Sequence, residues 1–447
     1  MGVAARRERR VAFHTFGCKL NQFETEALAS SFLAHGFVVV RADQEADAYV
    51  INTCTVTSRA DHKARSLIRG IAREHPNAPL LVTGCSAQTE PEALAALAAN
   101  IVVVPQSEKS RLLEIPQTLA ETLDTGEVPY ARLLGSLKAD QPSDPFALIV
   151  TVPAFHTRAF LKIQDGCDCR CAYCRVPLAR GRSVSLGLEE VLSRAAALES
   201  QGRREIVLTG VNISAWRASG TALPGLLREL LRSTTRARIR LTSIEPESIT
   251  SELVEVLAEP RICAHFHIPV QSGSDSVLAR MRRRSVSGRV IDSVRLLREA
   301  RDDPFVAADF MVGFPGETEE DFQRTRELVQ RLEFAALHVF PFSPRPGTDA
   351  ASMKQVVPER VRRERAGDLT ALAGKLSASY ARRWVGREVD VLLEGRPGAR
   401  AHGVTGNYLK VFVDGAPRDS ATPGRVARAE IIDAGRTCSA RFLGFID

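Results

Sequence analysis

Apolar residues in this chain come in short runs that alternate with stretches of helical period. In the first part the short runs predict buried parallel strands at 11–16, 49–52 and 80–83. Amphipathic helices are expected between them at 20–34 and 59–74. Strand–helix alternation of this kind predicts an α/β fold, with a small parallel α/β domain over residues 9–121.

The same alternation repeats six times in the middle of the chain. The expected strands lie at 160–164, 205–210, 239–244, 265–270, 306–312 and 337–342. Helices should fill the gaps, for example at 188–200, 223–232 and 319–332. Six such units predict a partial (β/α)6 barrel over residues 153–380, with active residues at the carboxyl ends of its strands.

The last segment, 384–447, has a different pattern of short strands separated by glycines. The strands are expected at 389–393, 409–413, 425–429 and 437–442, which predicts a small C-terminal antiparallel β-barrel. Residues 105–157 read as a connector, weakly helical at 109–123 and rich in Gly, Pro and Asp at 124–144. We assign no chemistry to this connector.

Three cysteines of the first domain follow its three predicted strands. Cys18, Cys54 and Cys85 each fall one to three residues past a strand's carboxyl end. Ligands bind at that edge of an open parallel sheet. A lone cysteine is usually an inert core residue, but three at one topological position predict a three-thiolate cluster site.

The middle region opens on a second group of cysteines, which follows its first predicted strand. Cys167, Cys171 and Cys174 have a C-x3-C-x2-C spacing, and Tyr173 precedes the last of them. A zinc site would need two separated pairs, whereas Cys169 crowds its neighbours. Three loop thiolates can hold a [4Fe–4S] cluster and leave the fourth iron open for a substrate. The spacing and Tyr173 fit the radical S-adenosylmethionine pattern.

Polar and glycine residues follow the other barrel strands, where they could hold a small cofactor. The candidates are Gly210, Glu245, Gln271, Ser272 and Gly313. Each taken alone also fits a tight strand-to-helix turn. His265 and His267 share one strand face, but the sequence supplies no further zinc ligand beside them, so we expect core histidines.

Composition and charge say more about where in the cell the protein works than about what it does. Sixty basic and 53 acidic residues give a net charge of +7, which permits an anionic partner without requiring one. Neither a secretory signal nor an apolar run long enough for a bilayer is visible, so we expect a cytoplasmic protein. Nine cysteines in a reducing compartment favour metal binding over disulfides.

Motifs along nearly the whole chain resemble the methylthiotransferase family. The runs at 16–22, 52–57 and 82–85 resemble its amino-terminal domain, and those at 180–183, 267–274 and 312–318 resemble its radical S-adenosylmethionine core. Residues 402–408 with 443–444 resemble its TRAM domain, which engages tRNA. The runs at 17–21 and 340–348 most resemble the branch that acts on N6-threonylcarbamoyladenosine at tRNA position 37.

The resemblance implies two [4Fe–4S] clusters, one on each cysteine trio, and two S-adenosylmethionine molecules per turnover. A radical formed at Cys167, Cys171 and Cys174 would remove hydrogen from C2 of the adenine. The cluster at Cys18, Cys54 and Cys85 would carry the sulfur. A reductant protein such as flavodoxin or ferredoxin and a sulfur donor are also implied. Cys169 departs from the family, which commonly has asparagine there.

Three other functions stay open at this point. The substrate could be isopentenyl-adenosine in tRNA or a ribosomal protein. The chain could also be a non-catalytic RNA-binding module that a metal stabilises. Zinc without iron would support the module, whereas iron and sulfide would support the enzymes.

Overall fold

The computed structural model describes residues 8–125, 144–395, 400–417 and 419–446. Within them the chain forms two compact units. The first unit contains residues up to His156 together with Asp165–Cys169 and Cys174–Ser183, and the second contains the rest. Two stretches of the central cysteine loop therefore pack with the amino-terminal domain, which the linear sequence does not show.

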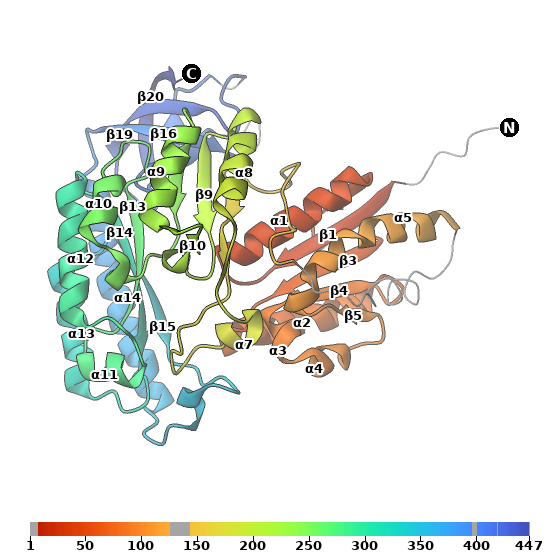
Figure 1. Ribbon diagram of the computed structural model, residues 1–447, viewed down its shortest axis with the longest axis horizontal. Helices are drawn as coiled ribbons and strands as arrows, with labels where there is room; N and C mark the ends of the chain where they lie inside the picture. The colour runs from red at the N-terminus through yellow and green to blue at the C-terminus, as the bar shows by residue number, and fades with distance from the viewer. Residues whose placement is uncertain (1–7, 126–143, 396–399, 418, 447) are drawn as a thin grey trace. The chain divides into compact units, whose positions relative to one another are not determined.

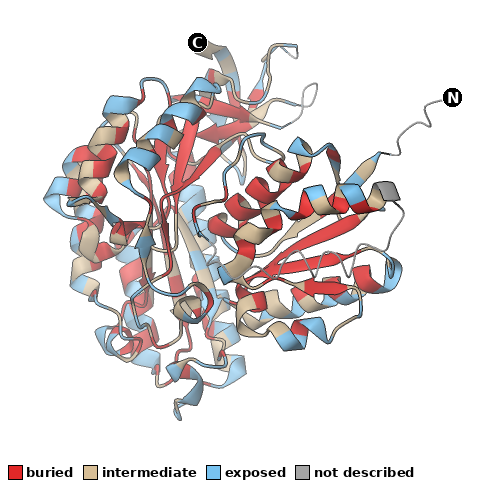
Figure 2. Cartoon of the chain, turned by 45° about the vertical axis from the view of Figure 1, so that its right-hand side comes forward, coloured by how far each residue is buried: buried red, intermediate tan, exposed pale blue. Residues whose placement is uncertain are grey.

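The first unit is built on a five-stranded parallel sheet of order β2-β1-β3-β4-β5. Its strands are β1 (Arg9–Thr15), β2 (Phe37–Val40), β3 (Ala48–Thr53), β4 (Leu80–Gly84) and β5 (Ile101–Val103). Every residue of β3 and β4 is buried, as a central parallel strand requires, and Figure 2 shows these strands within the unit's core. This confirms the predicted parallel α/β domain, while β2 and β5 were missed.

Helices cover this sheet and a connector closes the unit. They are α1 (Lys19–Ala34), α2 (Ser58–Glu74), α3 (Cys85–Thr89), α4 (Pro91–Ala95), η1 (Gln106–Leu113) and α5 (Ile115–Thr125). The stretch 144–156 returns along α1, where the buried carboxylate of Glu26 accepts the backbone N–H groups of Ala154 and Phe155 at 2.6 and 2.9 Å. Most of the predicted loop at 124–144 lies outside the described residues.

The second unit carries six strands in two three-stranded parallel sheets, β12-β9-β6 and β13-β14-β15 (Figure 1). The strands are β6 (Ala159–Lys162), β9 (Glu205–Thr209), β12 (Arg238–Leu241), β13 (His265–Gln271), β14 (Phe305–Val312) and β15 (Ala336–Pro341). Single bridges, Ile239 to Ile262 and Ser243 to His267, join the two sheets. All six strands match the predicted barrel strands to within a few residues.

The helices of this unit also follow the predicted pattern. They include α8 (Leu188–Ser200), α9 (Leu223–Ser233), α10 (Ser251–Leu257), α11 (Asp275–Arg280), α12 (Ser287–Ala300), α13 (Glu319–Leu332) and α14 (Glu359–Arg382). The short helix α7 (Val176–Arg180) belongs to the first unit. The start of α13 is fixed by a capping box, in which Thr318 and Asp321 exchange side-chain to backbone hydrogen bonds.

The carboxyl-terminal segment closes into a barrel of order β16-β17-β18-β20-β19. The strands are β16 (Glu388–Glu394), β17 (His402–Thr405), β18 (Lys410–Asp414), β19 (Val426–Asp433) and β20 (Cys438–Ile446). The predicted barrel is confirmed, but it is mixed and not wholly antiparallel, because β18 and β20 run parallel. The sequence pattern also missed β17.

A buried ion pair joins this barrel to the core of the same unit. Glu205 accepts hydrogen bonds from Arg238 and Arg240, and burial, which alone would raise its pKa, is outweighed by these arginines, so its pKa falls to about 2. Arg240 also donates to the carbonyls of Thr405 and Gly406 and lies 5.0 Å from the Tyr408 ring centre. Part of the TRAM-like motif therefore docks the barrel onto the core.

Candidate functional site: two cysteine clusters

The amino-terminal cysteines stand where three adjacent parallel strands end. Cys18 follows β1, Cys54 directly follows β3, and Cys85 directly follows β4. Gly17 has a φ of +103°, and a Cβ there would lie 2.8 Å from the Cβ of Cys54. Only glycine permits this approach, so the Gly17 turn brings the first cysteine loop against the second.

Three polar side chains tie these loops together. Asn21 Nδ2 donates to the carbonyls of Phe16 and Thr53 at 2.8 and 3.0 Å. Asn52 Nδ2 donates to the Asn21 carbonyl at 3.0 Å, and Ser86 Oγ donates to the Cys54 carbonyl at 2.9 Å. The loops are thereby held independently of any bound group, which is the preorganisation a metal site needs.

Buried cations lie beside these thiols. Burial raises the pKa of Cys54 to about 12 and also raises that of Cys85, so both are thiols unless a metal or a cation favours the thiolate. The Arg180 guanidinium, which opposes the rise at both cysteines, donates to Glu24 and Asp165 at 2.7 and 3.1 Å. Lys109 pairs with the other oxygen of Glu24.

The central cysteines share a second pattern, in which sulfur accepts a backbone N–H two residues further on. The Cys169 N–H points at Cys167 Sγ at 3.4 Å, and the Val176 N–H points at Cys174 Sγ at 3.4 Å. Val56 does the same for Cys54 at 3.5 Å. Hydrogen bonds to sulfur stabilise thiolate ligands and set the potential of iron–sulfur clusters, so the donor set fits such a group.

Cys171 has its own electrostatic partner. Arg283 Nη1 lies 3.8 Å from Cys171 Sγ, and the same guanidinium pairs with Glu245 and donates to the Pro269 carbonyl at 2.9 Å. The neighbouring Ala172 N–H donates to the Met281 carbonyl at 3.0 Å. Arg283 and Met281 thus hold the middle cysteine and its neighbour against the barrel.

Cys169 remains the unusual residue of this loop, and we expect that it is not a ligand. It is partly exposed, and its backbone already supports Cys167. The variant Cys169→Asn should therefore retain the iron, sulfide and visible absorbance of both clusters. Anaerobic iron analysis and absorbance spectra test this, and loss of one cluster's absorbance would make Cys169 a ligand.

The predicted cofactor residues occupy the carboxyl ends of their strands. Gly210 approaches Gln164 so closely that a Cβ would lie 2.8 Å from its carbonyl oxygen. Gln271 has a φ of +73° at an irregularity of β13, a conformation that a non-glycine residue rarely adopts. Gly313 also has a positive φ, and its N–H donates to Glu317 at 2.9 Å. At these three positions the backbone conformation or a close backbone contact is unusual, as expected where a ligand approaches the backbone closely.

The other predicted cofactor residues are more engaged by the protein itself. Glu245 is paired with Arg283, although burial still raises its pKa. Ser272 Oγ contacts Thr325 Oγ1 at 3.3 Å and accepts the Ser274 N–H at 3.1 Å. Tyr173 packs beside the apolar cluster around Phe314. Their contact with a cofactor stays a prediction.

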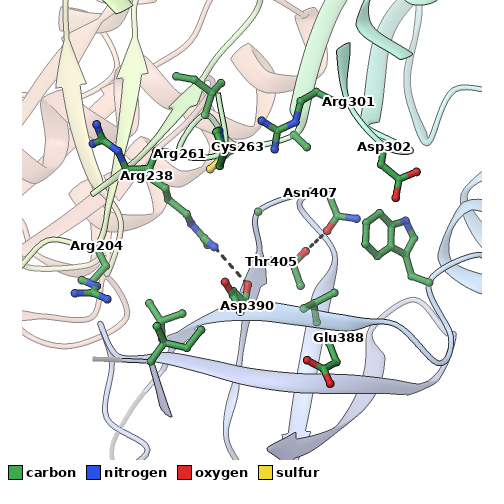
Figure 3. Close-up of a pocket in the computed structure, with 18 of the residues that line it drawn as sticks. Arg204, Arg238, Arg261, Cys263, Arg301, Asp302, Glu388, Asp390, Thr405 and Asn407 are labelled. Carbon is green, nitrogen blue, oxygen red and sulfur yellow. Dashed lines mark hydrogen bonds between the residues drawn. The ribbon is translucent and has the colours of Figure 1, made fainter. Parts of the chain in front are cut away.

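A cavity of about 510 Å³ lies between the core and the small barrel of the second unit (Figure 3). Several arginines line it, and three of them donate hydrogen bonds to backbone carbonyls. Arg238 donates to the Asp390 and Val404 carbonyls, Arg261 to the Ala237 carbonyl and Arg301 to the Ala258 carbonyl. None of the six predicted cluster cysteines lines this cavity, which lies between two parts of the second unit.

Comparisons with known proteins agree with this geometry. Residues 10–105 match the family described as uncharacterized protein family UPF0004, and residues 161–329 match the radical SAM superfamily. The threonylcarbamoyladenosine tRNA methylthiotransferase of Treponema pallidum is 39% identical over 95% of this chain and 98% of its own length. The Bacillus subtilis enzyme of the same name is 38% identical over 95% of this chain and 94% of its own length. The chain belongs to the radical S-adenosylmethionine methylthiotransferase family.

A further relative and a solved structure are also similar to this chain. The tRNA-2-methylthio-N(6)-dimethylallyladenosine synthase of Cereibacter sphaeroides is 34% identical over 96% of this chain and 97% of its own. The radical S-adenosylmethionine methyltransferase TsrM from Kitasatospora setae, with cobalamin and a [4Fe–4S] cluster bound, has a TM-score of 0.56 at 17% identity, covering 77% of both chains. That similarity supports the fold alone.

Membership of this family implies a [4Fe–4S] cluster and S-adenosylmethionine. The sequence analysis gives neither Arg180 nor Arg283 a role beside a cysteine, because the residues they contact lie far away along the chain. The structure also corrects the expectation that no further metal ligand lies beside His267. Asp309 and His338 do lie beside it, with possible ligand atoms within 4.8 Å of one another.

Proposed function

We propose that this methylthiotransferase adds a methylthio group to C2 of N6-threonylcarbamoyladenosine at position 37 of tRNA. The observation that carries the proposal is the pairing of two three-cysteine sites within one family fold. The threonylcarbamoyladenosine tRNA methylthiotransferases compared with this chain are 32–39% identical to it, and the dimethylallyladenosine synthases are 34–36% identical. The two highest of these identities, 39% and 38%, are to threonylcarbamoyladenosine enzymes. The proposed domains are 9–121, 153–380 and 384–447.

The assignment of cluster ligands is part of the same proposal. Cys167, Cys171 and Cys174 would hold the cluster that reductively cleaves S-adenosylmethionine, with Tyr173, Gly210, Glu245, Gln271, Ser272 and Gly313 around the cofactor. Cys18, Cys54 and Cys85 would hold a second cluster. When bound, these groups supply the radical and the sulfur, which acid–base side chains cannot. The protein's own residues orient them and exclude water.

The electrostatic arrangement supports these roles. Arg180 and Lys109 provide buried positive charge beside the amino-terminal thiols, where a cluster and an anionic sulfur group would bring negative charge. Arg283 does the same near Cys171. A reductant protein such as flavodoxin or ferredoxin and a sulfur donor complete the proposed reaction. Among the described residues, no helix is both long and apolar enough to cross a membrane.

The test is a product assay on defined tRNAs. Protein with both clusters reconstituted is incubated with S-adenosylmethionine, a reductant, sulfide and tRNA that carries either threonylcarbamoyl- or isopentenyl-adenosine. We expect a methylthio mass shift only on the threonylcarbamoyl nucleoside. A shift only on isopentenyl-adenosine would move the protein to the sister branch. A methylthio mass shift on a ribosomal protein, or zinc in place of iron in the purified protein, would contradict the proposal that this is a tRNA-modifying enzyme.

A further inference from the structure

Strand β15 presents two exposed side chains that the cluster chemistry does not use. His338 and Phe340 are two residues apart, so they lie on the same face of the strand. The His338 side chain is 54% exposed and Phe340 is 38% exposed. Among the described strands, β15 pairs only with β14 and forms the edge of its sheet.

A hydrogen-bond chain holds His338 in one orientation. Asp309 lies opposite it in register, and Asp309 Oδ1 is 3.0 Å from His338 Nδ1. The same oxygen is 2.8 Å from His267 Nε2, while His267 Nδ1 is 3.2 Å from Ser243 Oγ. All three links are direct hydrogen-bond contacts.

The ionised state of Asp309 decides which ring nitrogen of His338 carries the hydrogen in this hydrogen-bonded chain of side chains. Burial alone would raise its pKa, but the hydrogen bonds from both histidines outweigh burial and hold it at about 2. An ionised carboxylate only accepts, so His338 must donate through Nδ1. In the neutral ring Nε2 is then an acceptor, and it is the part of His338 left for a ligand.

Phe340 supplies an apolar surface beside this acceptor. It lies opposite Met311 on β14, while the other face of the sheet buries Ile268 and Phe310 completely. An exposed ring next to an oriented hydrogen-bonding group is the usual recognition surface for an unstacked base of single-stranded RNA. In this sheet β13 ends at Gln271, and Gly313 directly follows the end of β14 at Val312; both are predicted cofactor positions.

We propose that this face of β15 binds the target nucleoside, with Phe340 stacking on the adenine and His338 Nε2 accepting a hydrogen bond from its N6 substituent. The inference rests on the proposed function and adds the residues that read its substrate. A threonylcarbamoyl group offers ureido N–H and hydroxyl donors, whereas a dimethylallyl group is apolar. A fixed acceptor at this position favours the polar substituent.

Binding assays with short RNAs test the two contacts separately. The holoenzyme is titrated with anticodon stem–loops that carry either threonylcarbamoyladenosine or plain adenosine at position 37, and with one that carries 2-aminopurine there. Phe340→Ala should weaken all three by about tenfold and abolish the stacking quench of 2-aminopurine. His338→Leu should reduce the preference for the modified loop by about three- to tenfold, and His338→Gln should partly restore it.

Two substitutions elsewhere serve as matched controls. Phe155→Ala removes another exposed phenylalanine, 47% exposed, and His62→Leu removes an exposed histidine of α2. Both should bind the loops like the wild type. S-adenosylmethionine cleavage without RNA should be unchanged in both controls, and far-ultraviolet circular dichroism shows whether every variant is folded.

The outcomes separate this inference from the proposed function. If the wild type methylthiolates threonylcarbamoyl-tRNA but Phe340→Ala and His338→Leu bind as it does, the β15 face is not the nucleoside site. If His338→Leu weakens both adenosine loops equally, His338 does not read the substituent. Failure of the wild type on every tRNA would instead sink the proposed function.

Discussion

Replacing Cys18, Cys54 and Cys85 together by alanine is expected to halve the iron content and to abolish methylthiolation, while S-adenosylmethionine cleavage persists. The reason is that these thiols end three strands of one sheet, whereas Cys167, Cys171 and Cys174 belong to a separate loop. Iron and sulfide analysis, with 5′-deoxyadenosine measured by chromatography, checks both halves of the prediction.

Cys263→Ala is the control for the triple variant. Cys263 is a buried free thiol of the second unit and should keep all the iron. Full iron in the triple variant would show that the amino-terminal site is misassigned. Loss of all cleavage would instead show that the two sites are not independent.

The second large effect is expected at Arg180. Its side chain is 2% exposed, and it pairs with Glu24 and Asp165, which are 0% and 5% exposed. Removing one partner of such a buried pair leaves an uncompensated charge and costs about 3–5 kcal/mol. In Arg180→Ala the peptides of α1 and α7 should therefore exchange their amide hydrogens about a hundredfold or more faster, as hydrogen-exchange mass spectrometry measures.

A neighbouring arginine provides the control for this experiment. Arg182 contacts Asp168 at 3.5 Å, but its side chain is 92% exposed. Arg182→Ala should leave exchange in α1 and α7 unchanged, because an exposed pair contributes little. Equal exchange in the two variants would show that the buried network does not hold the cysteine loops in place.

Elements with strong local periodicity were predictable from the sequence. Helices α8 and α13 match their predicted bounds, and all six barrel strands were found. The cysteines at strand ends were also identified, because parallel strands bring their carboxyl ends to one edge whatever the details of packing. The pattern of apolar residues records which side chains face a core, and that is enough for these features.

The short elements were not predictable. Strands β2, β5 and β17 have three or four residues, too few for a period to stand out from the background. The parallel pairing of β18 with β20 was missed for a related reason, since strand direction within a closed barrel depends on the path of the whole chain.

The charged network of the site was decided only by tertiary structure. Arg180 meets Glu24 across 156 residues, Arg283 meets Cys171 across 112, and His338 meets Asp309 across 29. An arginine in a basic run looks the same in sequence whether it is solvated or buried, because local periodicity carries no record of a distant partner. The sequence thus determined where the thiols gather, and the fold determined which charges and rings surround them.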